Sequence, residues 1–224
     1  MPDPFAEERA RAEFELAKKL GRALSLQEKL VLDALGFPPD ASKLTAAFLA
    51  TLAAETMPFV QDAIEAHALA SAETVIGTIT ATLGDSVYRE SVRVWAEEHA
   101  YEMSRYLNDT TRQVVGDLVT RYTETSGMTR QDFEDALNES GLFSPSRASA
   151  IAVTETTAAT SAGTAAAAEE ARAAGLEVTE TWRTQDGGCE EICAPLDGTT
   201  RGDGWDEEPP AHVNCACWVE MGWA

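Results

Sequence analysis

Residues 88–122, YRESVRVWAEEHAYEMSRYLNDTTRQVVGDLVTRY, carry the clearest periodic pattern in this sequence of 224 residues. Apolar and aromatic side chains recur there every three or four residues, which is the spacing of one face of an α-helix. The face consists of Tyr88, Val92, Trp95, His99, Met103, Tyr106, Thr110, Val114, Leu118 and Tyr122. We predict a single helix of roughly 35–40 residues whose striped face packs into a core. A face that docks on partner helices is the alternative.

Helical patterns continue on both sides of this stretch. Ser25 with Glu28 matches a capping box, and Ser144 precedes a proline, as is typical of a helix N-terminus. Pro58 suits the start of a helix, and Gly84 suits the end of one. The predicted helices cover residues 3–24, 25–36, 41–56, 58–83, 129–138 and 144–175.

The pattern changes after Gly175. Leu176, Val178 and Trp182 alternate with mostly polar residues, which predicts a strand, and residues 215–221 form a second strand-like run. We therefore predict a mainly α protein with a small α+β module at its C-terminal end. The predicted division is a helical domain over 1–143 and an α+β domain over 144–224.

All four cysteines lie in the last 36 residues, in the patterns Cys189-x3-Cys193 and His212-x2-Cys215-x-Cys217. Structural zinc sites use four thiolates, or three thiolates and one imidazole, from two short loops. A strand over 215–221 would place its two cysteines on one face. Five candidates compete for four positions, and we expect His212 to be omitted before any thiolate. The prediction is a β-hairpin region clamped by zinc, with disulfides or unpaired buried thiols as the alternatives.

Glu155 lies at the centre of an alanine-rich face of the helix predicted over 144–175. A carboxylate on such a face costs free energy unless it has a partner. We predict that Glu155 accepts hydrogen bonds from the region around Trp182 and His212, and that it organises the module without taking part in chemistry.

The charge of the chain limits its partners. Asp and Glu number 38 against 17 Lys and Arg, which gives a net charge of −21. Binding to a phosphate backbone depends on Lys and Arg, so direct nucleic-acid binding is not expected, and neither is a DNA-reading zinc ribbon. The longest run without a charged residue is the thirteen residues between Glu155 and Glu169, so we expect no membrane span. The stretch MPDPFAEERARAEF at residues 1–14 carries four acids and no apolar segment, so we expect no secretory signal. We expect synthesis in a cytoplasm, where clustered cysteines favour metal binding.

Common catalytic motifs are missing from the sequence. It contains no HExxH, nucleophile elbow, phosphate loop, EF-hand or zinc-deaminase pattern. We therefore expect a protein without enzymatic activity. The alternative is a metal-dependent hydrolase that uses Glu155, Asp186 and His212 around an open metal position.

Several short motifs follow one another over residues 145–217. In chain order they are Arg147-Ala148, IAVTET over 151–156, Gly175, Trp182, Thr184, Asp186, the first cysteine pair, Leu196-Asp197-Gly198, and PPAHVNCAC over 209–217. This ordered set resembles the tailed-phage minor head protein family, the phage Mu F-like head morphogenesis proteins. Ala216 replaces an arginine in that family's usual ending, Val153 replaces an arginine often found before Thr-Glu, and the first cysteine pair is one residue wider.

The resemblance implies a virion protein present in few copies, inside the capsid or at its portal vertex. It implies a role in head assembly, genome packaging or ejection, with portal or capsid proteins as partners of the helical N-terminal part. It implies no enzymatic activity. Homo-oligomerisation is left open.

Overall fold

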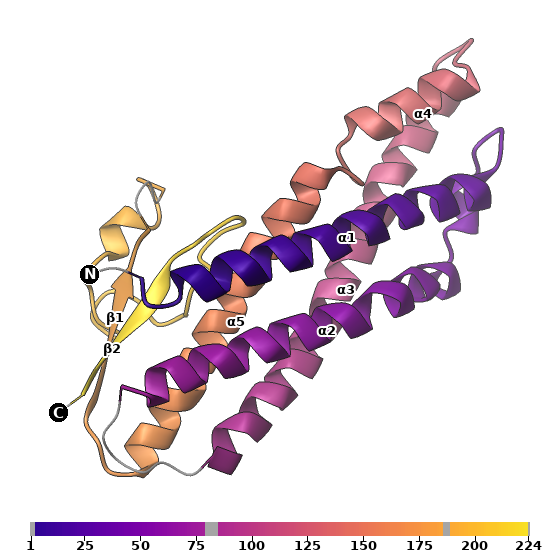
Figure 1. Ribbon diagram of the computed structural model, residues 1–224. Coiled ribbons are helices and arrows are strands. Elements are labelled where there is room, and N and C mark those ends of the chain that lie inside the picture. The colour runs from indigo at the N-terminus through magenta and orange to yellow at the C-terminus, as the bar shows by residue number, and fades with distance from the viewer. Residues whose placement is uncertain (1–2, 79–84, 186–188, 224) are drawn as a thin grey trace.

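The computed structural model describes residues 3–78, 85–185 and 189–223 (Figure 1). It confirms a mainly helical fold with a small sheet and a Cys/His cluster near the C-terminal end. The helices are α1 (Ala6–Leu35), α2 (Ala46–Ile76), α3 (Asp85–Glu124), α4 (Arg130–Glu139) and α5 (Pro145–Ala173), with short 3-10 helices η1 (Ala41–Lys43) and η2 (Ala194–Leu196). The strands are β1 (Val178–Arg183) and β2 (Trp218–Trp223). None of the described helices has an apolar stretch long enough to cross a bilayer.

Four long helices form an antiparallel bundle in which α5 packs against α1, α2 and α3 (Figure 1). The short helix α4 lies at one end of the bundle, and the two strands lie at the other, beside the start of α1. Helices α5 and α2 pack closely at one glycine: a Cβ atom built on Gly163 would lie 2.0 Å from the carbonyl oxygen of Ala68. Only glycine therefore allows the two helices to pack at this distance.

Helix ends follow the predicted capping residues where the chain changes direction. Thr129 and Asp132 form a capping box at α4, and the side chain of Ser144 accepts a hydrogen bond from the N–H of Arg147 at the start of α5. The predicted break at Ser25 is wrong, because α1 continues through this position and buries Leu24 and Val31 in one core.

The predicted boundary at Pro58 is also wrong. Pro58 lies inside α2, which begins at Ala46 with Thr45 as its N-cap. The buried residues Leu52 and Val60 lie on either side of the proline, so packing holds the helix together where one backbone hydrogen bond is lost. The helix ends at Ile76, and the predicted end at Leu83 and Gly84 lies outside the described residues.

The long predicted helix is present as α3, but its buried face is rotated from the predicted stripe. Tyr106 is 67% exposed, while Trp95 and His99 are only partly buried. Small side chains take the central positions because they let α2 and α5 approach closely. The buried face consists of Tyr88, Val92, Ala96, Ala100, Met103, Leu107, Val115 and Val119.

The two strands pair in antiparallel register, with Trp182 opposite Val219. The other edge of β1 is covered by residues 198–201, because the N–H of Trp182 donates to the carbonyl of Thr199 at 2.9 Å. The main core includes residues from both sides of the boundary predicted at 143/144. A second, smaller core lies under the hairpin and consists of Trp182, Cys193, Trp205, Cys215, Cys217 and Val219.

Candidate metal centre

Cys189 and Cys193 lie in one tight turn after β1. The N–H groups of Cys193 and Ala194 both donate to the carbonyl of Cys189, at 3.1 and 3.0 Å. The N–H of Ile192 also donates to the Cys189 sulfur at 3.2 Å. Backbone hydrogen bonds to this sulfur, with the contribution of Cys193 the largest, lower the pKa of the Cys189 thiol. The turn therefore favours the thiolate, which is the form that binds metals.

The second loop, which carries His212, Cys215 and Cys217, is fixed to α5. The N–H of Asn214 donates to the hydroxyl of Thr154 at 2.8 Å, and the hydroxyl of Thr157 donates to the carbonyl of Cys215 at 2.7 Å. Asn214 has a φ of 63°, a left-handed conformation that asparagine tolerates better than most residues. The loop is thus held on one face of α5 immediately before β2 begins.

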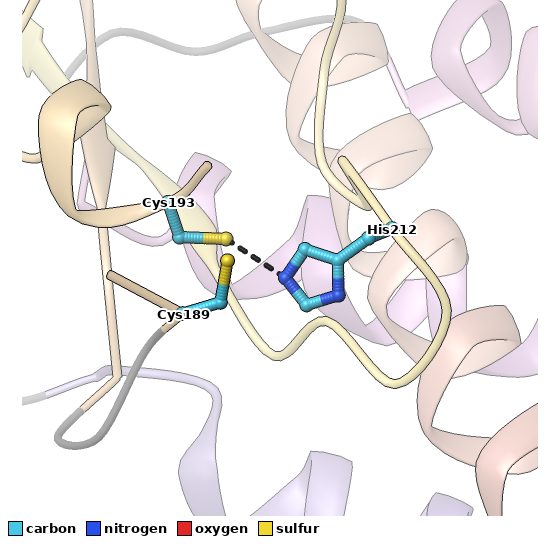
Figure 2. A group of neighbouring side chains, drawn as sticks. All are labelled: Cys189, Cys193 and His212. Atoms are coloured by element: carbon cyan, nitrogen blue, oxygen red, sulfur yellow. Dashed lines mark hydrogen bonds between the residues drawn. The ribbon is translucent and has the colours of Figure 1, made fainter. Parts of the chain in front are cut away.

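The two loops bring all five predicted ligands together around Cys193. Ligand atoms of Cys189, Cys193 and His212 lie within 4.8 Å of one another, and so do those of Cys193, Cys215 and Cys217. Figure 2 shows the first group, in which the Cys193 sulfur lies 3.0 Å from Nε2 of His212. Cys193 belongs to both groups, so it is the centre of the cluster.

One sulfur–sulfur distance in the cluster matches that of a tetrahedral metal site. Zinc–sulfur bonds of about 2.3 Å separate two sulfur ligands by about 3.8 Å, and the sulfurs of Cys193 and Cys215 lie 3.8 Å apart. All four cysteines are free thiols in the structure. The cluster can therefore hold a metal ion.

His212 has the tautomer that a metal ligand needs. Its Nδ1 lies 2.8 Å from the carbonyl oxygen of Val213, which can only accept, so Nδ1 carries the proton. Nε2 then has a free lone pair directed at the Cys193 sulfur. A hydrogen bond from the second ring nitrogen to a backbone carbonyl is the usual way in which proteins orient a ligating histidine.

The buried cysteines differ in their acidity. The hydrogen bond from Cys217 lowers the pKa of Cys215 to about 5, while burial raises the pKa of Cys193 to about 11. The pKa of Cys217 is also raised, mainly by its hydrogen bond to Cys215. One thiolate is therefore available near neutral pH, and a bound cation would favour deprotonation of the other two.

The first turns of α1 border the cluster, a contact that the sequence analysis did not predict. A cavity of about 490 Å³ separates Arg9 and Glu13 from Cys189, Cys193 and His212. Arg9 is buried and forms an ion pair with Asp3, and burial raises the pKa of Glu13. The cluster is thus enclosed by α5 and the hairpin but is open towards α1.

The other predicted site residues have different outcomes. Glu155 is buried, as predicted, but its carboxylate accepts a hydrogen bond from Nε2 of His99 on α3 at 2.6 Å, so the predicted partners near Trp182 and His212 are wrong. Glu155 belongs to neither group of side chains that could hold a metal ion. Trp182 lies in the small core with the cysteines. Asp186 lies outside the described residues.

Sequence reasoning missed the role of Glu180, whose carboxylate is buried in the hairpin. It forms ion pairs with Arg172 at the end of α5 and with Arg201 in the loop beside β1. Arg201 also lies over the ring of Trp205, 4.4 Å from its centroid. A glutamate on the apolar side of a predicted strand was the available signal, because a buried carboxylate needs cationic partners.

Comparison of the chain with protein-family models, with curated proteins and with solved structures gave no match.

Proposed function

We propose that this chain is a structural and assembly protein of a tailed-phage head, in which one zinc ion clamps the C-terminal hairpin. The observation that carries the clamp is the convergence of two loops on Cys193, from residues 189–193 and 212–217. The place in a virion, near the portal, rests on the ordered motifs over residues 145–217.

The donors around Cys193 favour a structural ion over a catalytic one. Cys193, Cys215 and Cys217 are buried, and both Cys189 and His212 reach the same side of Cys193. A fourth ligand, from Cys189 or His212, would close the coordination sphere around the three buried thiolates and would leave no position for a reactive water. Cys189 and His212 compete for the fourth position.

The clamp would give the hairpin the rigidity that an assembly surface needs. The described hairpin has two strands, and a sheet of this size is marginally stable without additional support. A metal ion that joins the loop before η2 to the loop before β2 would fix both against α5. Portal or capsid proteins are the proposed partners, and host cytoplasm is the proposed place of synthesis.

Metal analysis tests the clamp. Protein purified without chelator should contain one zinc per chain, and at most one of its four thiols should react in the native state. Denaturation with a chelator should release the zinc and expose all four thiols. Metal-free protein with four reactive native thiols would overturn the clamp, as would metal-free protein that shows no thiols after denaturation, because that result would indicate disulfides.

Mass spectrometry of purified virions tests the place of action separately. The chain should be present in few copies per particle, and it should be lost together with the portal when heads are disrupted. Absence of the chain from mature particles and from assembly intermediates would overturn the virion assignment while leaving the metal result intact.

A further inference from the structure

A second cavity, of about 370 Å³, lies between α3 and α5 on a different part of the bundle from the cysteine cluster. Trp95 and His99 of α3 form one wall, and the alanine face of α5 around Ala162 forms the floor. Glu169 and Glu208 complete its rim. We call this cavity the Trp95 groove.

The wall of the groove is rigid and aromatic. The rings of Trp95 and His99 are stacked, with centroids 4.8 Å apart and planes 18° apart. The second ring is held by its hydrogen bond to Glu155, which also balances any positive charge on the imidazole. Trp95 remains partly exposed. The indole is thus presented in a fixed orientation to whatever enters the groove.

Two polar groups in the groove lack a partner within the described part of the chain. Ser161 is 3% exposed, lines the groove, and its hydroxyl has no hydrogen-bond partner there. Glu169 is exposed and has no recorded ion pair among the described residues, whereas Glu208 is paired with Arg201 at 2.5 Å. A buried hydroxyl without a partner costs free energy, which a donor from a ligand would recover.

The groove carries negative charge, which favours binding of a cation. No Lys or Arg lines it among the residues that the structure describes, and Glu169 supplies an unbalanced negative charge in a chain with a net charge of −21. An arginine side chain matches these features, because its stem can lie on the alanine floor and its guanidinium can stack on an indole while donating to a carboxylate and a hydroxyl. We propose that the Trp95 groove binds an arginine side chain presented by a partner protein. This binding requires neither the metal cluster nor a virion location.

The test uses a blocked peptide, Ac-Ala-Ala-Arg-Ala-Ala-NH2, and the same peptide with citrulline, which keeps the shape of arginine without its charge. The indole N–H signal of Trp95, assigned with the Trp95→Phe variant, is followed by NMR during titration of each peptide. The arginine peptide should shift this signal saturably, and the citrulline peptide should bind at least about fivefold more weakly.

Two variants and a matched control locate the binding. Glu169→Gln should weaken the arginine peptide about fivefold, while Glu177→Gln, which removes the same charge at an exposed position outside the groove, should change affinity less than twofold. Ala162→Leu should fill the groove and abolish the shift. Equal binding of the two peptides, or equal effects of Glu169→Gln and Glu177→Gln, would overturn the proposal, as would unchanged binding to a folded Ala162→Leu variant.

Discussion

Nε2 of His99 on α3 lies 2.6 Å from Oε2 of Glu155 on α5, so the two helices share a partly buried pair that becomes an ion pair when the imidazole is protonated. Burial opposes protonation of the ring, but the hydrogen bond and the charge of Glu155 outweigh it, and the pKa of His99 is raised above its ordinary value. The pair therefore links α3 to α5, the helix against which the loop with Cys215 is held.

This pair should make stability depend on pH in the neutral to alkaline range. The pKa of His99 is higher in the folded state than in the unfolded state, where it is about 6.5. The stabilisation of the fold by protonated His99 is therefore complete below about pH 6.5, and it is lost as pH rises through the pKa of the folded state. Glu155→Gln should therefore cost about 1 kcal/mol more at pH 6 than at pH 9. Urea unfolding at both pH values measures this difference, and an equal cost at both would contradict the assignment.

His67 should have the opposite effect in acid. Burial lowers its pKa to about 4, and its ring donates to the hydroxyl of Thr160, which itself donates to the carbonyl of Thr156. The unfolded state therefore takes up a proton first, and the free energy of unfolding should fall by about 1.5 kcal/mol between pH 6.5 and pH 5. His67→Gln keeps a donor but cannot titrate, so its unfolding free energy should be flatter over this range. The same slope in both proteins would refute this role.

Gly163 should tolerate no larger side chain. Gly163→Ala places a methyl group against the backbone of Ala68, which cannot move without separating α2 from α5, so we expect a loss of at least about 2 kcal/mol. Gly116→Ala is the matched control, because nothing lies within 4 Å of a Cβ built there on α3. That change should stabilise the protein by about 0.5–1 kcal/mol. Denaturant unfolding of both variants measures these changes in stability. Similar changes in the two variants would show that the close approach of α2 and α5 is unimportant.

Cys193 should matter more to the clamp than any other cysteine. It belongs to both groups of ligands, so Cys193→Ser should reduce bound zinc to below about a tenth of the wild-type content and should lower the melting temperature. Cys189→Ser should retain most of the metal, because His212 can replace it at the fourth position. Metal content and thermal melting of the two variants provide the comparison. Equal losses would mean that Cys189 is a required ligand.

The sequence predicted helix ends best where capping residues coincide with a change in chain direction. Thr129 and Ser144 begin α4 and α5 after short non-helical segments, residues 125–128 and 140–143, in which the chain changes direction. The pattern at Ser25 has the same local chemistry, yet the helix continues because buried leucines and valines occur on both sides of it. Local propensity is weak where tertiary packing favours a continuous helix.

The composition of the metal cluster was predictable, but the reason for its geometry was not. Cys215 and Cys217 were expected to point together because they would alternate on a strand, whereas both precede β2, which begins at Trp218. Their position depends instead on hydrogen bonds to Thr154 and Thr157, which lie about 60 residues earlier in the chain. Contacts between such distant segments have no signature in local spacing. The same holds for Glu155 and its partner on α3.

Strand β2 packs against both hydrophobic cores. Trp218 packs with the helical bundle, while the next residue, Val219, packs with the cysteines and Trp182. Heating cannot expose one side of this strand without disturbing the other. Differential scanning calorimetry of the whole chain should accordingly record one endotherm, and removal of the proposed zinc with a chelator should shift that endotherm downward without splitting it in two.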